Sequence, residues 1–156
     1  MRLVGIAVKM ETEGRPTARG ILTETGAVPP AIVDQFELSG DDVDFTRQLF
    51  ELSQSTKSRL TALHPDRVVV CRADFPPQQS RTEGPKLRLL AEGAIAAAAR
   101  EVVPETFLTT GKEIGEWDHS SKDQVKVKAK AMVKTHGLPL KWVEAAMAAI
   151  GALVRP

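Results

Sequence analysis

The stretch Arg67–Ala73, RVVVCRA, decides the fold class, because it places three valines and a cysteine in one short apolar run. Such a run is typical of a strand that is buried on both faces, as in a sheet with helices on both sides. His64-Pro65 precedes the run, and a polar loop, Asp74–Pro85, follows it. We therefore predict that Arg67–Ala73 is a strand at the centre of an α/β sheet.

Upstream of this strand, the sequence predicts three short strands and then one amphipathic helix. The strands are Arg2–Lys9, Ala18–Glu24 and Ala31–Leu38, which are separated by glycine or proline. Strands this close in the chain are joined by hairpins, so we expect them to be antiparallel. The helix covers Asp41–Leu63, where apolar residues recur at helical spacing and aspartates stand at the start.

Downstream, the sequence predicts three helices and a fifth strand. Helical spacing of apolar residues marks Lys86–Glu101 and Leu140–Val154 as helices. Ser120 or Ser121 caps a third helix over Lys122–Thr135, because Ser121 and Gln124 have the spacing of a capping box. Val102–Thr109 contains a short apolar group that predicts the strand. The order βββ-α-β-α-β-α-α then gives a mixed five-stranded sheet flanked by helices on both faces.

The composition predicts one domain over residues 1–156 and a cytoplasmic location. A chain of 156 residues with 42% hydrophobic residues suits a single core. Its one cysteine cannot form an internal disulfide, which favours a reducing compartment. No apolar run approaches the ~18 residues that a membrane span needs, so we expect no membrane partner.

The segment order and several local strings resemble the RuvC-type Holliday-junction resolvases and their ribonuclease H-like relatives. Met1–Val8 is similar to the opening strand of that family, Pro65–Cys71 to its catalytic strand, and Leu90–Val103 to the helix that follows. Ser121–Val133 resembles the family's lysine-containing helix, and Leu140–Leu153 resembles its closing helix. The resemblance covers most of the chain and implies a ribonuclease H-like fold, with three antiparallel hairpin strands followed by parallel strands.

The resemblance also implies a two-metal nuclease site, from which this chain departs. The active family holds its metals with carboxylates on the first strand, at the end of the fourth strand and, three residues apart, on the last helix. Ala7 and Cys71 align with the first two positions, and Lys141 and Glu144 align with the paired acids. Only Glu144 retains a carboxylate. We therefore predict a catalytically inactive protein without a metal cofactor.

Lys141 stands three residues before Glu144, a spacing at which opposite charges on one helix face can pair. The simpler interpretation is an exposed helical ion pair. The other interpretation is that the ammonium supplies positive charge where the family holds a metal.

An enzyme with relocated carboxylates is the alternative. Asp74 follows the central strand, and Glu11 and Glu13 follow the first strand. Ligands bind at the carboxyl ends of strands in open α/β sheets, so Asp74, Glu144 and Glu11 or Glu13 could converge on Mg²⁺ or Mn²⁺. In that case the protein is a metal-dependent endonuclease.

The net charge of +1 hides an uneven distribution. Residues 119–156 hold seven Lys or Arg and two acids, whereas residues 10–55 hold nine acids and three basic residues. A lysine-rich helix face can bind phosphates, although a solvated face is an equal alternative. The absence of Tyr and the 4% aromatic content count against base stacking. The candidate contacts to DNA or RNA are Lys122, Lys126, Lys130 and Lys134.

A protein–protein interaction module is the third class. The alanine-rich helices Lys86–Glu101 and Leu140–Val154 could pack against another subunit. Because relatives in the family are often homodimers, the resemblance implies a homodimer.

Overall fold

Five strands form one mixed sheet in a computed structural model that describes residues 1–27, 30–41, 43–74 and 83–156. The sheet order is β3-β2-β1-β4-β5. β1 and β2 are antiparallel, as are β2 and β3, whereas β4 runs parallel to both β1 and β5. The predicted α/β architecture is therefore confirmed. The strands are β1 (Arg2–Met10), β2 (Pro16–Glu24), β3 (Ile32–Ser39), β4 (Arg67–Arg72) and β5 (Thr106–Thr110).

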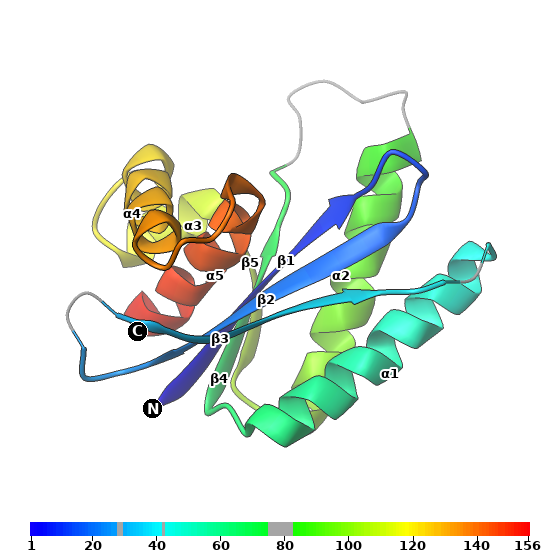
Figure 1. Ribbon diagram of the computed structural model, residues 1–156, viewed down its shortest axis with the longest axis horizontal. Coiled ribbons are helices and arrows are strands. Elements are labelled where there is room, and N and C mark those ends of the chain that lie inside the picture. Colours follow the sequence, from blue (N-terminus) through cyan, green and yellow to red (C-terminus); the bar gives the residue numbers. More distant parts are fainter. Residues whose placement is uncertain (28–29, 42, 75–82) are drawn as a thin grey trace.

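Helices cover both faces of the sheet (Figure 1). α1 (Phe45–Leu63) and α2 (Glu83–Val102) lie on one face. On the other face lie α3 (Gly111–Trp117), α4 (Lys122–Thr135) and α5 (Val143–Val154), which a short 3₁₀ turn, Leu140–Trp142, precedes. No helix of the described residues is long and apolar enough to cross a membrane.

The predicted central strand is β4, and its inner residues are buried on both faces. The middle strand of the sheet is nevertheless β1, because two strands lie on each side of it. β2 and β3 lie on one side, and β4 and β5 lie on the other. The loop predicted after β4 lies mostly outside the described residues, as does Asp42 at the predicted start of α1. α1 begins later than predicted, since the Asp44 side chain accepts a hydrogen bond from the Thr46 N–H at 2.9 Å and caps the helix.

α3 is a helix that the sequence did not predict. This helix has only seven residues, which is too short for a periodic apolar pattern. Thr110 is both the last residue of β5 and the N-cap of α3, and its capping box with Glu113 satisfies backbone groups at the start of the helix.

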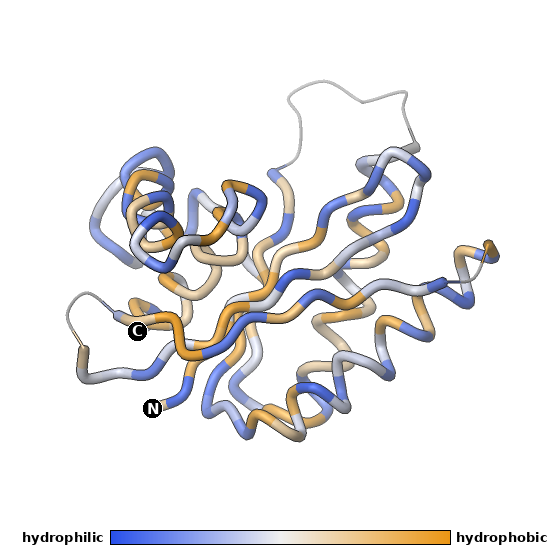
Figure 2. The backbone as a smooth tube through the Cα atoms, in the orientation of Figure 1, coloured by the Kyte–Doolittle hydropathy of each residue, from blue (hydrophilic) through white to orange (hydrophobic). Residues whose placement is uncertain are grey.

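Alternating side chains of β1 and β4 supply two cores. The core against α1 and α2 contains Val4, Ile6, Val8, Val68 and Val70. The core against α3, α4 and α5 contains Leu3, Ala7, Val69 and Cys71. Figure 2 shows hydrophobic residues along the middle of the sheet.

The backbone of α5 approaches β1 very closely at Gly5. A Cβ atom at Gly5 would lie 1.9 Å from the backbone nitrogen of Ala149. The glycine and the small side chains of α5 therefore set the separation between helix and sheet, and with it the position of the first turn of α5.

Candidate functional site

The four positions aligned with metal ligands meet beside the first turn of α5. Ala7 and Cys71 are register partners in the parallel β1–β4 ladder. Ala7, Lys141 and Glu144 line a cleft with a volume of about 400 Å³. Cys71 and Glu144 line an adjoining cavity of about 270 Å³, together with Asp74. Residues far apart in the sequence therefore surround one hollow of the surface.

Basic side chains dominate this hollow, which we call the cationic cleft. Glu144 is the one acidic residue among the described residues that line its larger part. The basic lining residues are Lys9, Arg19, Arg88, Lys122, Lys126 and Lys141.

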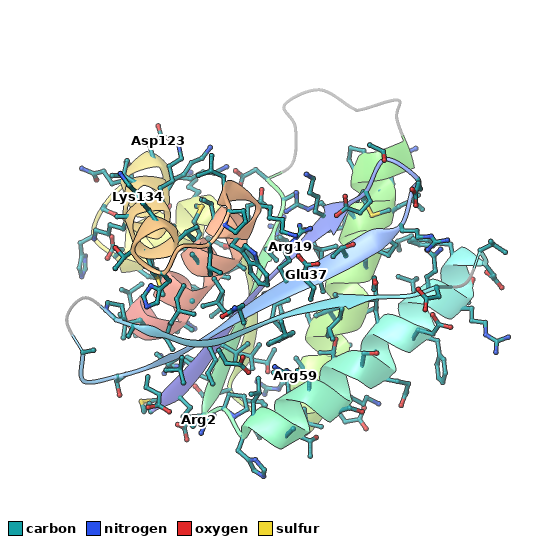
Figure 3. All side chains as sticks on the ribbon, in the orientation of Figure 1. Arg2, Arg19, Glu37, Arg59, Asp123 and Lys134 are labelled. Atoms are coloured by element: carbon teal, nitrogen blue, oxygen red, sulfur yellow. The ribbon has the colours of Figure 1, made fainter. Side chains whose placement is uncertain are left out.

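A buried arginine, rather than a carboxylate, lies beside Ala7. Arg19 is the register partner of Ala7 in the β1–β2 ladder, and its side chain is 8% exposed. Its Nε donates to Glu37 Oε1 at 2.9 Å and its Nη2 to Glu11 Oε1 at 3.2 Å. Arg19 and Glu37 come from the neighbouring strands β2 and β3 (Figure 3). The alanine position thus borders a fixed cation.

Cys71 is a buried thiol on the other side of Ala7. Burial raises the pKa of this thiol to about 12. A thiol of that pKa stays protonated near neutral pH and is a poor ligand for a hard cation. Cys71 therefore acts as a small apolar side chain in the core against α5.

Lys141 pairs with Glu37 instead of Glu144, so the predicted helical ion pair is wrong. The Lys141 Nζ lies 2.7 Å from Glu37 Oε1. Lys141 belongs to the 3₁₀ turn and α5 begins at Val143, so Lys141 and Glu144 do not share a regular α-helical face. Hydrogen bonds from Lys141 and Arg19 lower the pKa of Glu37.

Arg88 on α2 lies between two carboxylates. Its Nε donates to Glu92 Oε1 at 2.7 Å, and its Nη2 donates to Glu144 Oε2 at 2.8 Å. Glu92 is fully buried and also accepts the Ala73 N–H at 3.0 Å, just after β4. A guanidinium thus occupies the space between acids from α2 and α5.

Glu92 is a buried acid whose environment is only partly polar. Burial raises the pKa of its carboxyl, and the hydrogen bonds from Arg88 and Ala73 offset part of this effect. Its second oxygen, Oε2, has no hydrogen-bond partner among the described residues. Arg88 and Glu92 were not among the predicted site residues, although their i,i+4 spacing is that of a helical ion pair.

The relocated carboxylates come together only in part. Asp74 and Glu144 share the smaller cavity, but Asp74 pairs with Lys122 and Glu144 with Arg88. The ion pair with Asp74 raises the pKa of Lys122. Glu11 pairs with Arg19, and neither Glu11 nor Glu13 lines the described part of the cleft. The described residues contain no group of three or more His, Cys, Asp or Glu that could hold a metal ion.

The four lysines of α4 that the sequence proposes as nucleic-acid contacts divide into two pairs. Lys122 and Lys126 line the cationic cleft. Lys130 and Lys134 are exposed further along α4 and are not among the described lining residues. Figure 3 labels Lys134 on this helix. The helix face predicted from spacing therefore reaches the cleft only at its N-terminal end.

The fold is of the ribonuclease H-like class, with the RuvC arrangement of sheet and helices. A solved structure of Thermus thermophilus RuvC superposes with a TM-score of 0.68 and 16% identity, over 99% of this chain and 94% of that chain. The structure described as T. thermophilus RuvC in complex with Holliday junction substrate gives a TM-score of 0.66 and 15% identity over the same shares. No protein-family model and no curated protein matches the sequence. The comparison establishes a RuvC-like fold.

Proposed function

We propose that this chain binds nucleic acid through the cationic cleft and does not cleave it. One observation carries the proposal: the Arg88 guanidinium donates to Glu144, the one acid left at the positions aligned with metal ligands, and is itself held by Glu92. Ala7 and Cys71 add no carboxylate on the strand side. A two-metal nuclease needs several carboxylates around its metals, whereas a guanidinium and ammonium groups suit phosphate.

The fold supports nucleic acid as the source of that phosphate. The T. thermophilus protein of the same fold was solved with a Holliday junction substrate. Since the chain has no Tyr and few other aromatic residues, we expect contacts to the sugar–phosphate backbone rather than stacking on bases.

The ion pairs around the cleft limit the strength of binding. Among the described residues, Lys9 and Lys126 are the two lining cations without an ion-pair partner, while the other four are paired. Each neutralised duplex phosphate contributes about −0.9 to the slope of log K against log salt. Two free cations therefore give a slope of about −2, which is shallow for a protein that binds DNA.

Fluorescence anisotropy between about 50 and 200 mM salt tests binding. The probes are single-stranded, duplex and four-way-junction DNA, and a single-stranded RNA. We expect binding at the lower salt concentration with the slope given above. If none of the four probes binds at about 50 mM salt, the proposal is contradicted.

Incubation of the same DNAs with Mg²⁺ or Mn²⁺ tests catalysis. We expect intact DNA. Asp74 and Glu144 in one cavity favour the metal-dependent nuclease as the second candidate. The metal-dependent nuclease is established if the wild-type protein cuts DNA and if Glu144→Gln and Asp74→Asn each abolish the cutting. That result overturns the proposal that the protein binds nucleic acid without cleaving it.

A further inference from the structure

The two carboxylate partners of Arg88 differ in how firmly they are held. Glu92 is 0% exposed, and the Ala73 N–H fixes the same oxygen that accepts from Arg88. Glu144 is 53% exposed at the mouth of the cleft and contacts Arg88 through Oε2 alone. An exposed carboxylate with one such contact can be displaced by a competing anion far more readily than a buried one.

Arg88 has donors to spare for such an anion. A guanidinium carries five N–H donors in a planar fork, which matches the spacing of phosphate oxygens. The described residues give the Nη1 atom of Arg88 no hydrogen-bond partner, and the Arg88 side chain is 20% exposed. Lys122 lines both parts of the cleft beside it.

The N-terminus of α5 adds a second attraction for an anion. α5 has twelve residues, and no side chain caps its first turn. Val143 and Glu144, its first two residues, line the cleft. The positive end of the helix dipole favours negative charge at this point.

We propose that the Arg88 guanidinium is the seat of one phosphate group and that the Glu144 carboxylate occupies this seat in the free protein. This inference rests on the proposed function, and it names the group of the ligand that the cleft recognises. Glu92 is a positioning residue, because it holds the guanidinium toward the cleft while the phosphate replaces Glu144. The phosphate is either a backbone phosphodiester or a terminal phosphate.

Removal of the Glu144 charge tests the displacement. Glu144→Gln should tighten binding of a fluorescein-labelled single strand of about 20 nucleotides by about threefold to tenfold at about 50 mM salt, because the competing anion is gone. Glu101→Gln is the matched control, since Glu101 pairs with Lys57 at 2.5 Å and does not line the cleft. It makes the same change in net charge and should leave the affinity within about twofold of wild type.

Arg88→Lys tests the seat itself, since it keeps the charge and removes the planar fork. We expect weaker binding and loss of the tightening by Glu144→Gln in this background. Circular dichroism confirms that each variant is folded. A tightening of equal size with Lys at position 88 overturns the proposal.

Two substitutions at Glu92 separate positioning from packing. Glu92→Gln keeps an oxygen that can accept from Arg88 and Ala73, so binding should be retained. Glu92→Leu fills the same space without an acceptor, and affinity should fall although the protein stays folded. Equal affinities for the two variants contradict the positioning role.

Two further ligands distinguish the sources of phosphate. Inorganic phosphate should compete with the oligonucleotide, with weaker competition in Arg88→Lys. A 5′-phosphorylated oligonucleotide that binds more tightly than its unphosphorylated form identifies a terminal phosphate, and equal affinities identify the backbone. Either result supports the phosphate seat.

The two proposals fail in different ways. If Glu144→Gln weakens binding or leaves it unchanged while Lys126→Ala weakens it, the phosphate seat is wrong and nucleic-acid binding stands. If the wild-type protein binds no nucleic acid, the proposed function fails. The seat is then tested with inorganic phosphate alone: a rise in Tm that depends on Arg88 supports it, and no rise overturns it.

Discussion

Ala7 lies directly beside Cys71 in the β1–β4 ladder, and both side chains are almost completely buried. These are the two strand positions at which the RuvC resemblance implies metal-binding acids. Their small, uncharged side chains face α5, while Arg19 borders Ala7 from β2. Among the described strand residues, those that line the cleft therefore include cations and no carboxylate.

Lys126 should contribute more to nucleic-acid binding than Lys130, although both are exposed on α4. Lys126 lines the cleft without an ion-pair partner among the described residues, whereas Lys130 lies one turn further from it. We expect Lys126→Ala to weaken binding about threefold to tenfold at low salt and to reduce the salt slope by about 1. Lys130→Ala is the matched control. Equal losses for the two variants in salt-dependent anisotropy would place the interface along the whole helix.

Arg88→Ala should destabilise the protein by about 3 to 5 kcal/mol at pH 8, because it leaves the Glu92 carboxylate buried without its ionic partner. Burial raises the pKa of Glu92, so the folded chain holds this proton more tightly than the unfolded chain. The contribution of protonated Glu92 to the free energy of unfolding is fully present below the ordinary glutamate pKa of 4.5. This contribution is lost as the pH rises through the raised pKa of the folded protein. In urea unfolding, Arg88→Ala should lose less free energy of unfolding relative to wild type at pH 4.5 than at pH 8.

A second substitution provides the control for this interpretation. Arg88→Ala/Glu92→Gln has no buried charge, so it should recover at least part of the stability lost at pH 8. Its deficit should change little between the two pH values. A deficit in Arg88→Ala that is independent of pH would show that lost packing, rather than the Glu92 charge, causes the effect.

The Cys71 thiol should react only when the protein unfolds. Burial raises its pKa to about 12, so at pH 8 about one thiol in ten thousand is ionised. Labelling with Ellman's reagent should therefore follow the unfolding rate and accelerate with urea. A fast phase in native buffer would show that the cavity admits the reagent and that the thiol is activated.

Gly5→Ala should destabilise the protein by about 3 kcal/mol, because the added methyl group would overlap the backbone of α5 at Ala149. Gly93→Ala is the matched control. Gly93 is exposed on α2 with nothing within 4 Å of an added Cβ, so this substitution should stabilise the helix by up to about 1 kcal/mol. Thermal unfolding of the two variants should shift in opposite directions. A Gly5→Ala variant as stable as wild type would mean that α5 can move away from the sheet.

Local patterns predicted most of the fold. The valine run predicted β4, and the helical spacing of apolar residues predicted α1, α2 and α5, because each of these segments buries its own apolar face. The capping-box spacing of Ser121 and Gln124 predicted α4. α3 was not predicted because its seven residues are too few for a periodic apolar pattern, although Thr110 and Glu113 have the spacing of a capping box.

The candidate site was harder to predict because tertiary contacts decide its chemistry. Alignment brought Ala7, Cys71, Lys141 and Glu144 into one group, and the structure places them around one hollow. The partner of Glu144 is Arg88, which is 56 residues away in the sequence. Spacing alone favoured Lys141, but the 3₁₀ turn before α5 redirects that side chain to β3.

The backbone positions of β1, β4 and α5 at the cleft are independent of the charge of the side chains that they carry. Ladder register and the close contact at Gly5 fix where the side chains at positions 7, 71, 141 and 144 project, whatever those side chains are. The backbone thus specifies a meeting point but leaves the sign of its electrostatic potential open. Ala7→Asp, Cys71→Glu and Lys141→Asp would together change the formal charge there by four units in the negative direction. The local charge at this meeting point is therefore set by a few side chains and not by the topology of the fold.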